Sequence, residues 1–196
     1  PPIDQFLDFA RKAEDMGFDP LLFSDTVSLS HFRILDPFPI MTLAAQVTKT
    51  ATIGTCVTNP VTRHLSVTAN AFATVDHIAG GRTVLGIGSG DTALYLLGKK
   101  YVNLAGMRET IEVLRGLLDG KPVVYEGQEL RSNWDKKNLP IFLAADGPKM
   151  LALGGELANG LIVGAGLSGE VIDWVRGRVG EGEALAGRPH GSVPIW

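Results

Sequence analysis

One stretch, residues 51–91, constrains the fold of this 196-residue chain more than any other. It opens with a β-branched and apolar segment at 52–57, which predicts a strand. Apolar residues then recur at helical spacing up to Gly80-Gly81, at Val67, Ala71, Val75 and Ile78. Residues 83–87 predict a second buried strand, so the stretch is one strand–helix–strand unit, the repeating element of a parallel sheet.

The rest of the chain repeats this alternation. We expect further helices at residues 3–16, 37–47, 104–118, 150–157 and 171–179. We expect further strands at residues 20–23, 139–145 and 161–163, and another that begins at Val193. A loop or broken helix at 92–100 and a surface hairpin at 122–131 interrupt the pattern. The alternation predicts a parallel α/β sheet, and periodicity leaves open whether it is a doubly wound sheet or a barrel.

The composition is that of one globular domain over residues 1–196, with 45% hydrophobic residues and a net charge of -3. No basic cluster is dense enough for nucleic-acid binding, and no apolar run approaches the length of about 18 residues that a membrane span needs. The single cysteine, Cys56, excludes an internal disulfide and a CxxC metal site, and it fits a reducing compartment such as the cytoplasm. No metal site is expected, because metal-ligand spacing is absent among His31, His64, His77 and His190.

Polar or glycine-rich loops follow two of the predicted strands. Ser24-Asp25-Thr26 follows the strand at 20–23, and Gly88-Ser89-Gly90-Asp91 follows the strand at 83–87. Ligand sites in parallel α/β folds lie at the carboxyl ends of the strands, so both loops are candidates for the site. The glycines have GxGxG spacing and match the GxGxxG dinucleotide fingerprint poorly, and a structural turn is the alternative for them.

Two later loops favour anion binding. Ala145-Asp146-Gly147-Pro148-Lys149 places a glycine and a proline at the first turn of a helix, where free backbone N–H groups could bind a phosphate. The alternative is a capped helix with a solvated Lys149. The loop 164–168 follows the next strand, so the two loops could share one anion pocket. Arg63-His64, close after Asn59-Pro60, is more readily interpreted as a structural pair that holds its loop by hydrogen bonds.

Several motifs together resemble the luciferase-like monooxygenase superfamily. They are IGTCVTNP at 53–60, TRH at 62–64, AFAT at 71–74, AGGR at 79–82 and LGIGSGD at 85–91. Ser24-Asp25, AADGPK at 144–149 and the loop at 164–168 are also similar to this group, so the resemblance spans nearly the whole chain. Within the superfamily, the chain is most similar to coenzyme F420-dependent oxidoreductases of the methylenetetrahydromethanopterin reductase type.

The resemblance implies a TIM (β/α)8 barrel, which separates the two folds that periodicity leaves open. A complete barrel has eight strands, and here the first strand and the C-terminal strands are missing or partial, so we expect an incomplete barrel and a chain that is a fragment. The implied activity is hydride transfer between coenzyme F420, a deazaflavin, and a small organic substrate that the residues do not identify. The alternatives are an FMN-dependent monooxygenase and a non-catalytic relative that binds the cofactor or a partner. The resemblance also implies a homodimer.

The resemblance further implies roles for individual residues in cofactor binding. Asp25 and Thr26 would edge the ring, and Cys56-Val57 would form a bulge under its face, with a cis peptide bond between them. Thr58 and Asp91 would contact the polar rim of the ring, and Asp91 would also be the catalytic residue that moves a proton as hydride is transferred. The phosphate or side-chain end would be lined by Ala145, Gly147, Gly166 and Leu167.

Overall fold

The structure is a computed structural model that describes residues 2–26, 34–95 and 97–196. Within these residues, five parallel strands form one sheet in the order β1-β2-β3-β6-β7. Their bounds are β1 (Leu21–Phe23), β2 (Ile53–Thr55), β3 (Thr83–Ile87), β6 (Ile141–Ala144) and β7 (Gly160–Ile162). The order of the strands in the sheet is their order along the chain. Each crossover helix therefore places the next strand on the same side of the strand before it.

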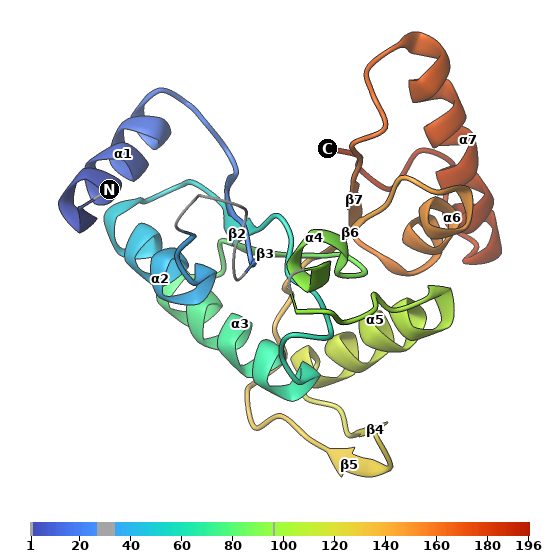
Figure 1. Ribbon diagram of the computed structural model, residues 1–196, viewed down its shortest axis with the longest axis horizontal. Coiled ribbons are helices and arrows are strands. Elements are labelled where there is room, and N and C mark those ends of the chain that lie inside the picture. Colours follow the sequence, from blue (N-terminus) through green and yellow to red (C-terminus); the bar gives the residue numbers. More distant parts are fainter. Residues whose placement is uncertain (1, 27–33, 96) are drawn as a thin grey trace.

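Helices cover the outer side of this sheet. Each packs against the next in chain order, α1 with α2, α2 with α3, α3 with α5, α5 with α6 and α6 with α7. Their bounds are α1 (Ile3–Asp15), α2 (Pro37–Val47), α3 (Leu65–Ala79), α5 (Leu104–Leu118), α6 (Pro148–Leu157) and α7 (Gly169–Leu185). Figure 1 shows them as an arc outside the strands, with the short α4 (Asp91–Tyr95) inside the arc.

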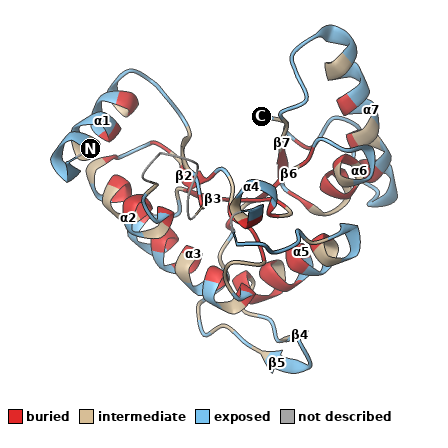
Figure 2. Cartoon of the chain, in the orientation of Figure 1, coloured by how far each residue is buried: buried red, intermediate tan, exposed pale blue. Residues whose placement is uncertain are grey.

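This arrangement confirms the predicted fold, an incomplete parallel barrel. A doubly wound sheet would place successive helices on opposite faces, and they would not form one continuous layer. β1 and β7 are the end strands of the sheet in the described part of the chain, so the barrel is open. The core lies between the strands and the inner faces of the helices, where Met41, Phe72 and Leu114 are fully buried (Figure 2).

The predicted element types are confirmed, and the main differences lie at the ends of elements. The strand expected at 52–57 ends at Thr55. Cys56 N still donates to Phe23 O (2.9 Å) and Thr58 N donates to Gly86 O (2.9 Å), but Val57 between them leaves the ladder. The strand expected from Val193 is present as one parallel bridge between Leu161 and Ile195.

The segment expected to be a loop or broken helix at 92–100 contains α4, which begins one residue earlier, at Asp91. The predicted surface hairpin is present as β4 (Val123–Tyr125) and β5 (Gln128–Leu130). Glu126 and Gly127 form its turn with φ of 51° and 74°, the left-handed pair that matches the twist of a two-residue hairpin.

An apolar groove of about 520 Å³ runs between α1 and β1, an end strand of the sheet that the described residues form. Its lining includes Phe9, Met16 and Phe18, whose side chains are all largely exposed. Such a groove is what an open barrel leaves beside its edge strand. None of the helices in the described residues has the length and apolar character needed to cross a membrane.

The carboxylate of Glu14 connects α1 by hydrogen bonds to the segment that precedes β2. It accepts hydrogen bonds from the backbone N–H groups of Lys49, Thr50 and Ala51 at 2.7–2.9 Å. Burial alone would raise the pKa of Glu14, but the hydrogen bonds from Ala51, Thr50 and Lys49 lower it to about 2 from an ordinary 4.5. The folded-state pKa is depressed, so the stabilisation is present above about pH 4.5 and is lost as the pH falls towards 2.

We therefore expect Glu14→Ala to lower the free energy of unfolding by about 1–2 kcal/mol at pH 7, a value reduced for solvent screening. The loss should shrink between about pH 4.5 and pH 2, measured by urea denaturation in acidic buffers. Asp15→Ala is the matched control, an exposed carboxylate on the same helix. Equal losses in the two variants, or a Glu14→Ala loss that does not change with pH, would contradict this role.

Candidate active site

A cleft of about 730 Å³ lies at the carboxyl ends of the strands. Every strand of the parallel sheet contributes to it through its last residue or the loop that follows. The contributing segments are 24–26 after β1, 56–59 after β2, 88–93 after β3, 144–147 at the end of β6, and Ile162 with Gly164 at the end of β7. This is the edge at which parallel β/α folds bind ligands.

Eight of the ten residues predicted to contact a cofactor line this one cleft. They are Asp25, Thr26, Cys56, Val57, Thr58, Asp91, Ala145 and Gly147. Gly166 and Leu167 do not line it, and the Leu167 side chain is 93% exposed. The roles of all ten residues stay predictions. The positions of Gly166 and Leu167, outside the lining of the cleft, do not support a role in cofactor binding.

Asp25 is a buried carboxylate in the wall of the cleft, with 7% of its surface exposed. The hydroxyl of Thr58, itself fully buried, donates to Asp25 Oδ2 at 2.7 Å. Arg63 donates from Nη2 to Asp25 Oδ1 at 3.3 Å and to Asp36 Oδ2 at 2.7 Å. Because the Thr58 hydroxyl is directed to Asp25, Thr58 fixes the carboxylate that faces the cleft.

Arg63 bridges two carboxylates that are distant in sequence. Burial by itself would lower the pKa of Arg63, but hydrogen bonds to Asp36 and Asp25 raise it overall. Its guanidinium also lies 4.8 Å from the centre of the Phe38 ring, at the start of α2. The structural interpretation of Arg63-His64 agrees with these contacts, and with His64, which caps α3 by accepting from Ser66 N at 3.3 Å.

The peptide bond between Cys56 and Val57 is cis, as predicted. Partial burial raises the pKa of the Cys56 thiol, so the thiol is protonated at neutral pH. Gly88 lies against this segment, since a Cβ there would be 3.0 Å from Val57 Cγ2 and 3.4 Å from Ala144 Cβ. Only a residue without a side chain fits there without displacing its neighbours.

The two loops expected to share an anion pocket are joined by a hydrogen bond. Asp146 Oδ1 accepts from the backbone N–H of Gly164 at 2.8 Å. Gly147 is the N-cap of α6 and has no side chain to cap the helix, and Pro148 follows at its first position. In the first turn of α6, Pro148 has no N–H group and Met150 N donates to Gly147 O at 3.1 Å, so Lys149 N is the backbone donor of that turn that is left for a ligand.

Charge is distributed unevenly in the cleft. Among the described residues that line it are three carboxylates, Asp25, Asp91 and Asp146, and no lysine, arginine or histidine. Any anionic group of a ligand would therefore depend on backbone N–H groups, such as that of Lys149 at the start of α6. His31, one of the histidines expected not to bind metal, lies outside the described residues. Within those residues, no group of three or more His, Cys, Asp or Glu could hold a metal ion.

Sequence reasoning missed several lining residues, among them Asn59, Tyr101 and Met150. Asn59 lies two residues after the predicted strand segment 52–57, so its position near a strand end was a usable signal. Tyr101 lies three residues before the start of α5 and Met150 lies inside α6, and neither position carries a sequence signal for a site.

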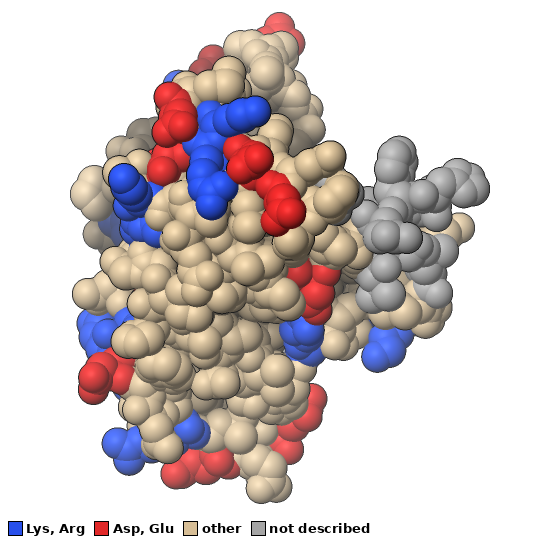
Figure 3. All heavy atoms as spheres, turned by 90° about the vertical axis from the view of Figure 1, so that its left-hand side faces the viewer, with Lys and Arg blue, Asp and Glu red and all other residues tan. Residues whose placement is uncertain are grey.

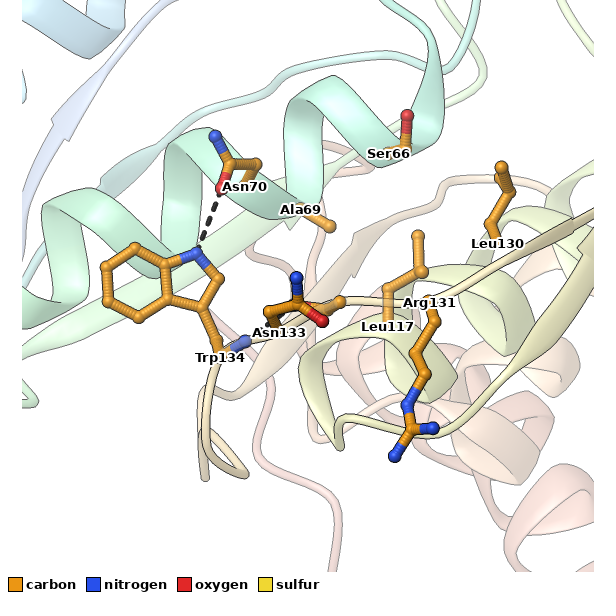
Figure 4. A pocket seen from close by; sticks show the side chains of 9 residues that line it. Ser66, Ala69, Asn70, Leu117, Leu130, Arg131, Asn133 and Trp134 are labelled. Carbon is orange, nitrogen blue, oxygen red and sulfur yellow. Dashed lines mark hydrogen bonds between the residues drawn. The ribbon is translucent and has the colours of Figure 1, made fainter.

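A groove of about 610 Å³ lies elsewhere, on the outer side of the helix layer between α3, α5 and the segment after β5 (Figure 4). Trp134 Nε1 donates to Asn70 Oδ1 at 2.9 Å across it. None of the residues predicted for the site lines this groove. It is therefore not the candidate site.

Parallel strands inside one layer of helices, with a ligand cleft at their carboxyl ends, define a β/α-barrel protein of the kind that carries enzyme sites. The sequence model described as "Luciferase-like monooxygenase" matches residues 1–196. The chain belongs to this family.

Named relatives refine the comparison. The chain is 37% identical over 164 residues to a 5,10-methylenetetrahydromethanopterin reductase of Archaeoglobus fulgidus, covering 80% of this chain and 48% of the relative. It is 33% identical to an F420-dependent glucose-6-phosphate dehydrogenase of Nocardia farcinica, covering 96% and 62%. The solved coenzyme F420-dependent tetrahydromethanopterin reductase of Methanopyrus kandleri superposes with a TM-score of 0.83 at 29% identity, covering 98% and 60%. The chain thus spans about half the length of the reductases that it resembles in sequence.

Proposed function

We propose that the chain is part of a coenzyme F420-dependent oxidoreductase that transfers a hydride between the deazaflavin and a small organic substrate. One observation carries the proposal. Eight predicted cofactor residues, spread over four segments of the sequence, converge on one cleft at the carboxyl ends of the strands. The relatives support the choice of cofactor, since two of those described above are named as F420-dependent enzymes.

The residues of the cleft fit such a cofactor. The volume of about 730 Å³ lies within the range of about 300–1,000 Å³ that is usual for cofactor sites. The buried amide of Asn59 has a donor, Nδ2, that no acceptor satisfies in the described residues. The start of α6 could hold an anionic group at one end of the cleft, at Gly147.

When bound, F420 would supply a ring carbon that gives or takes the hydride. The chain's own residues would orient the ring and move the proton. Asp25, held by Thr58 and Arg63, presents a fixed acceptor to the cleft. Asp91, which is exposed at the start of α4 and lines the cleft, would give a proton to the substrate or remove one.

A titration of the complete protein tests which cofactor it binds. We expect F420 to bind more tightly than FMN, measured by fluorescence quenching of each cofactor. Gly147→Glu should weaken binding by clash and repulsion, without loss of fold, because a Cβ at Gly147 meets nothing within 4 Å. Gly177→Glu on α7 is the matched control, since Gly177 is equally unobstructed and does not line the cleft.

The other readings predict different results. Equal or tighter binding of FMN would replace this proposal with an FMN-dependent monooxygenase. Binding of F420 without hydride transfer to any organic acceptor or from any donor would favour a non-catalytic relative.

The proposal includes a homodimer in the cytoplasm. α2 contains no charged residue, and the one acidic residue of α3, Asp76, is buried. Figure 3 views the side of the molecule on which α1 and α2 lie, and a broad central area there shows no charged side chain. An uncharged helical face is typical of surfaces that pair with a second copy, and a single cysteine suits a reducing compartment.

A further inference from the structure

Two arginines converge on the connection between α6 and β7, at the amino-terminal edge of the sheet. Arg188, which follows α7, donates from Nη1 to Ala158 O at 2.7 Å. Arg115, in the last turn of α5, donates from Nη2 to Asn159 Oδ1 and from Nη1 to Leu139 O at 3.4 Å. Because Ala158 and Asn159 are adjacent in the chain, the two guanidinium groups lie near each other although they come from different helices.

The charges of this pair are not neutralised by the chain. In the part of the protein that the structure describes, neither guanidinium forms an ion pair, and Asp119, whose charge acts on Arg115, is paired with Lys121 at 3.1 Å. Burial lowers the pKa of Arg115, Asp119 raises it, and the like charge of Arg188 lowers it again. Two half-buried positive charges held close together repel each other, so an anion between them would stabilise the folded chain.

Arg188 also has donors to spare. A guanidinium carries five N–H groups, and the bond to Ala158 O uses Nη1. Nε and Nη2 form the fork on one edge of the group, and they have no acceptor among the described residues. Neither atom is buried, so a solute can reach both.

A structural role explains part of this arrangement. Ala158 is the C-cap of α6, and an arginine at that place stabilises the end of a helix. That role accounts for the bond from Arg188 Nη1. It does not account for the unused fork of Arg188, or for the second guanidinium beside it.

We propose that Arg115 and Arg188 form a binding site for a phosphate group at the amino-terminal edge of the sheet. A phosphate group carries about 1.5 to 2 negative charges at neutral pH, which two guanidinium groups match. The Nε–Nη2 fork of Arg188 would hold two of its oxygens, and Arg115 would neutralise the remaining charge. The site lies at the opposite edge of the sheet from the cleft, and it does not depend on the proposed function.

Thermal melts of the complete protein in phosphate and in chloride, at equal ionic strength, test the site. We expect about 20 mM phosphate to raise the Tm of the parent by about 2–4 °C relative to chloride. Calorimetric titration should give a dissociation constant of about 1 mM or less for phosphate. Titrating glycerol phosphate beside inorganic phosphate shows whether the ligand is an organic ester or the free ion, according to which binds more tightly.

Arg188→Met should abolish the difference in Tm between the two buffers and weaken phosphate binding by about 10-fold or more. Arg188→Lys keeps the charge without the fork, so its difference should be intermediate. Either variant loses the bond to Ala158 O and can have a lower Tm in chloride. The readout is therefore the difference between buffers within each variant.

Two controls locate the bound phosphate. Arg11→Met removes a guanidinium from α1, beside the other end of the sheet, and should keep the full difference. Gly147→Glu obstructs the start of α6 at the cleft, the other candidate for an anion, and should also keep it. The inference is overturned if phosphate does not stabilise the parent more than chloride does, if Arg188→Met keeps the full difference, or if Gly147→Glu abolishes it.

Discussion

Asp91→Asn should lower turnover of the complete protein by about 10²–10⁴-fold, the range typical of a lost general acid or base. Asparagine keeps the size and much of the hydrogen bonding of aspartate but removes its charge and basicity. Asp91 lines the cleft, is exposed, and follows Gly90, whose positive φ of 101° brings the loop to the start of α4. The affinity for F420 should change much less than kcat, because the carboxylate is assigned to proton transfer.

The competing explanation is that Asp91 only stabilises the start of α4. That role predicts a lower Tm with turnover within a few-fold of the parent. Asp4→Asn is the matched control, because Asp4 is an acidic residue in the first turn of α1 and lies outside the cleft. Steady-state kinetics and thermal melts of the two variants decide between these roles. A few-fold change in turnover would remove Asp91 from catalysis.

The fold could be predicted from sequence because each local signal agreed with the next. Helical spacing, breaks at glycine and proline, and short β-branched runs all indicated strand–helix repeats. Periodicity did not reveal on which side the helices lie, since that depends on contacts such as those of α3 with α5, whose segments come from different repeats. The family motifs, and not the periodicity, indicated that the sheet is a barrel.

The candidate site was predictable where it follows strand ends and unpredictable where it depends on contacts across the sheet. Arg63 and Asp25 are 38 positions apart, and nothing in either local sequence indicates that they meet. The unpaired donor of Asn59 is likewise a product of the turn, because it exists only once Val61 and Thr62 occupy the amide oxygen. Leu167 is the opposite case, since its loop follows a strand end but its side chain is exposed and does not line the cleft.

Arg63→Met should lower the free energy of unfolding by about 2–3 kcal/mol, measured by urea denaturation. Removing one partner of a buried ion pair costs about 3–5 kcal/mol, and the value is reduced here because the Arg63 side chain is 27% exposed. The Asp25 side chain is only 8% exposed, so the variant leaves a buried carboxylate with Thr58 as its sole partner among those described above. The contact of the guanidinium with Phe38 is lost as well.

A double variant identifies the cause of this loss of stability. In Arg63→Met/Asp25→Asn the buried group is neutral and can still accept from Thr58, so this variant should be more stable than Arg63→Met alone. Arg11→Met is the matched control, because its pair with Asp8 is exposed on both sides, at 50% and 65%, and should contribute less than about 0.5 kcal/mol. If the double variant is no more stable than Arg63→Met, an unpaired Asp25 is not the source of the loss. Arg63 would then act through Asp36 and Phe38 at the start of α2, and the acceptor that Asp25 presents to the cleft would not depend on it.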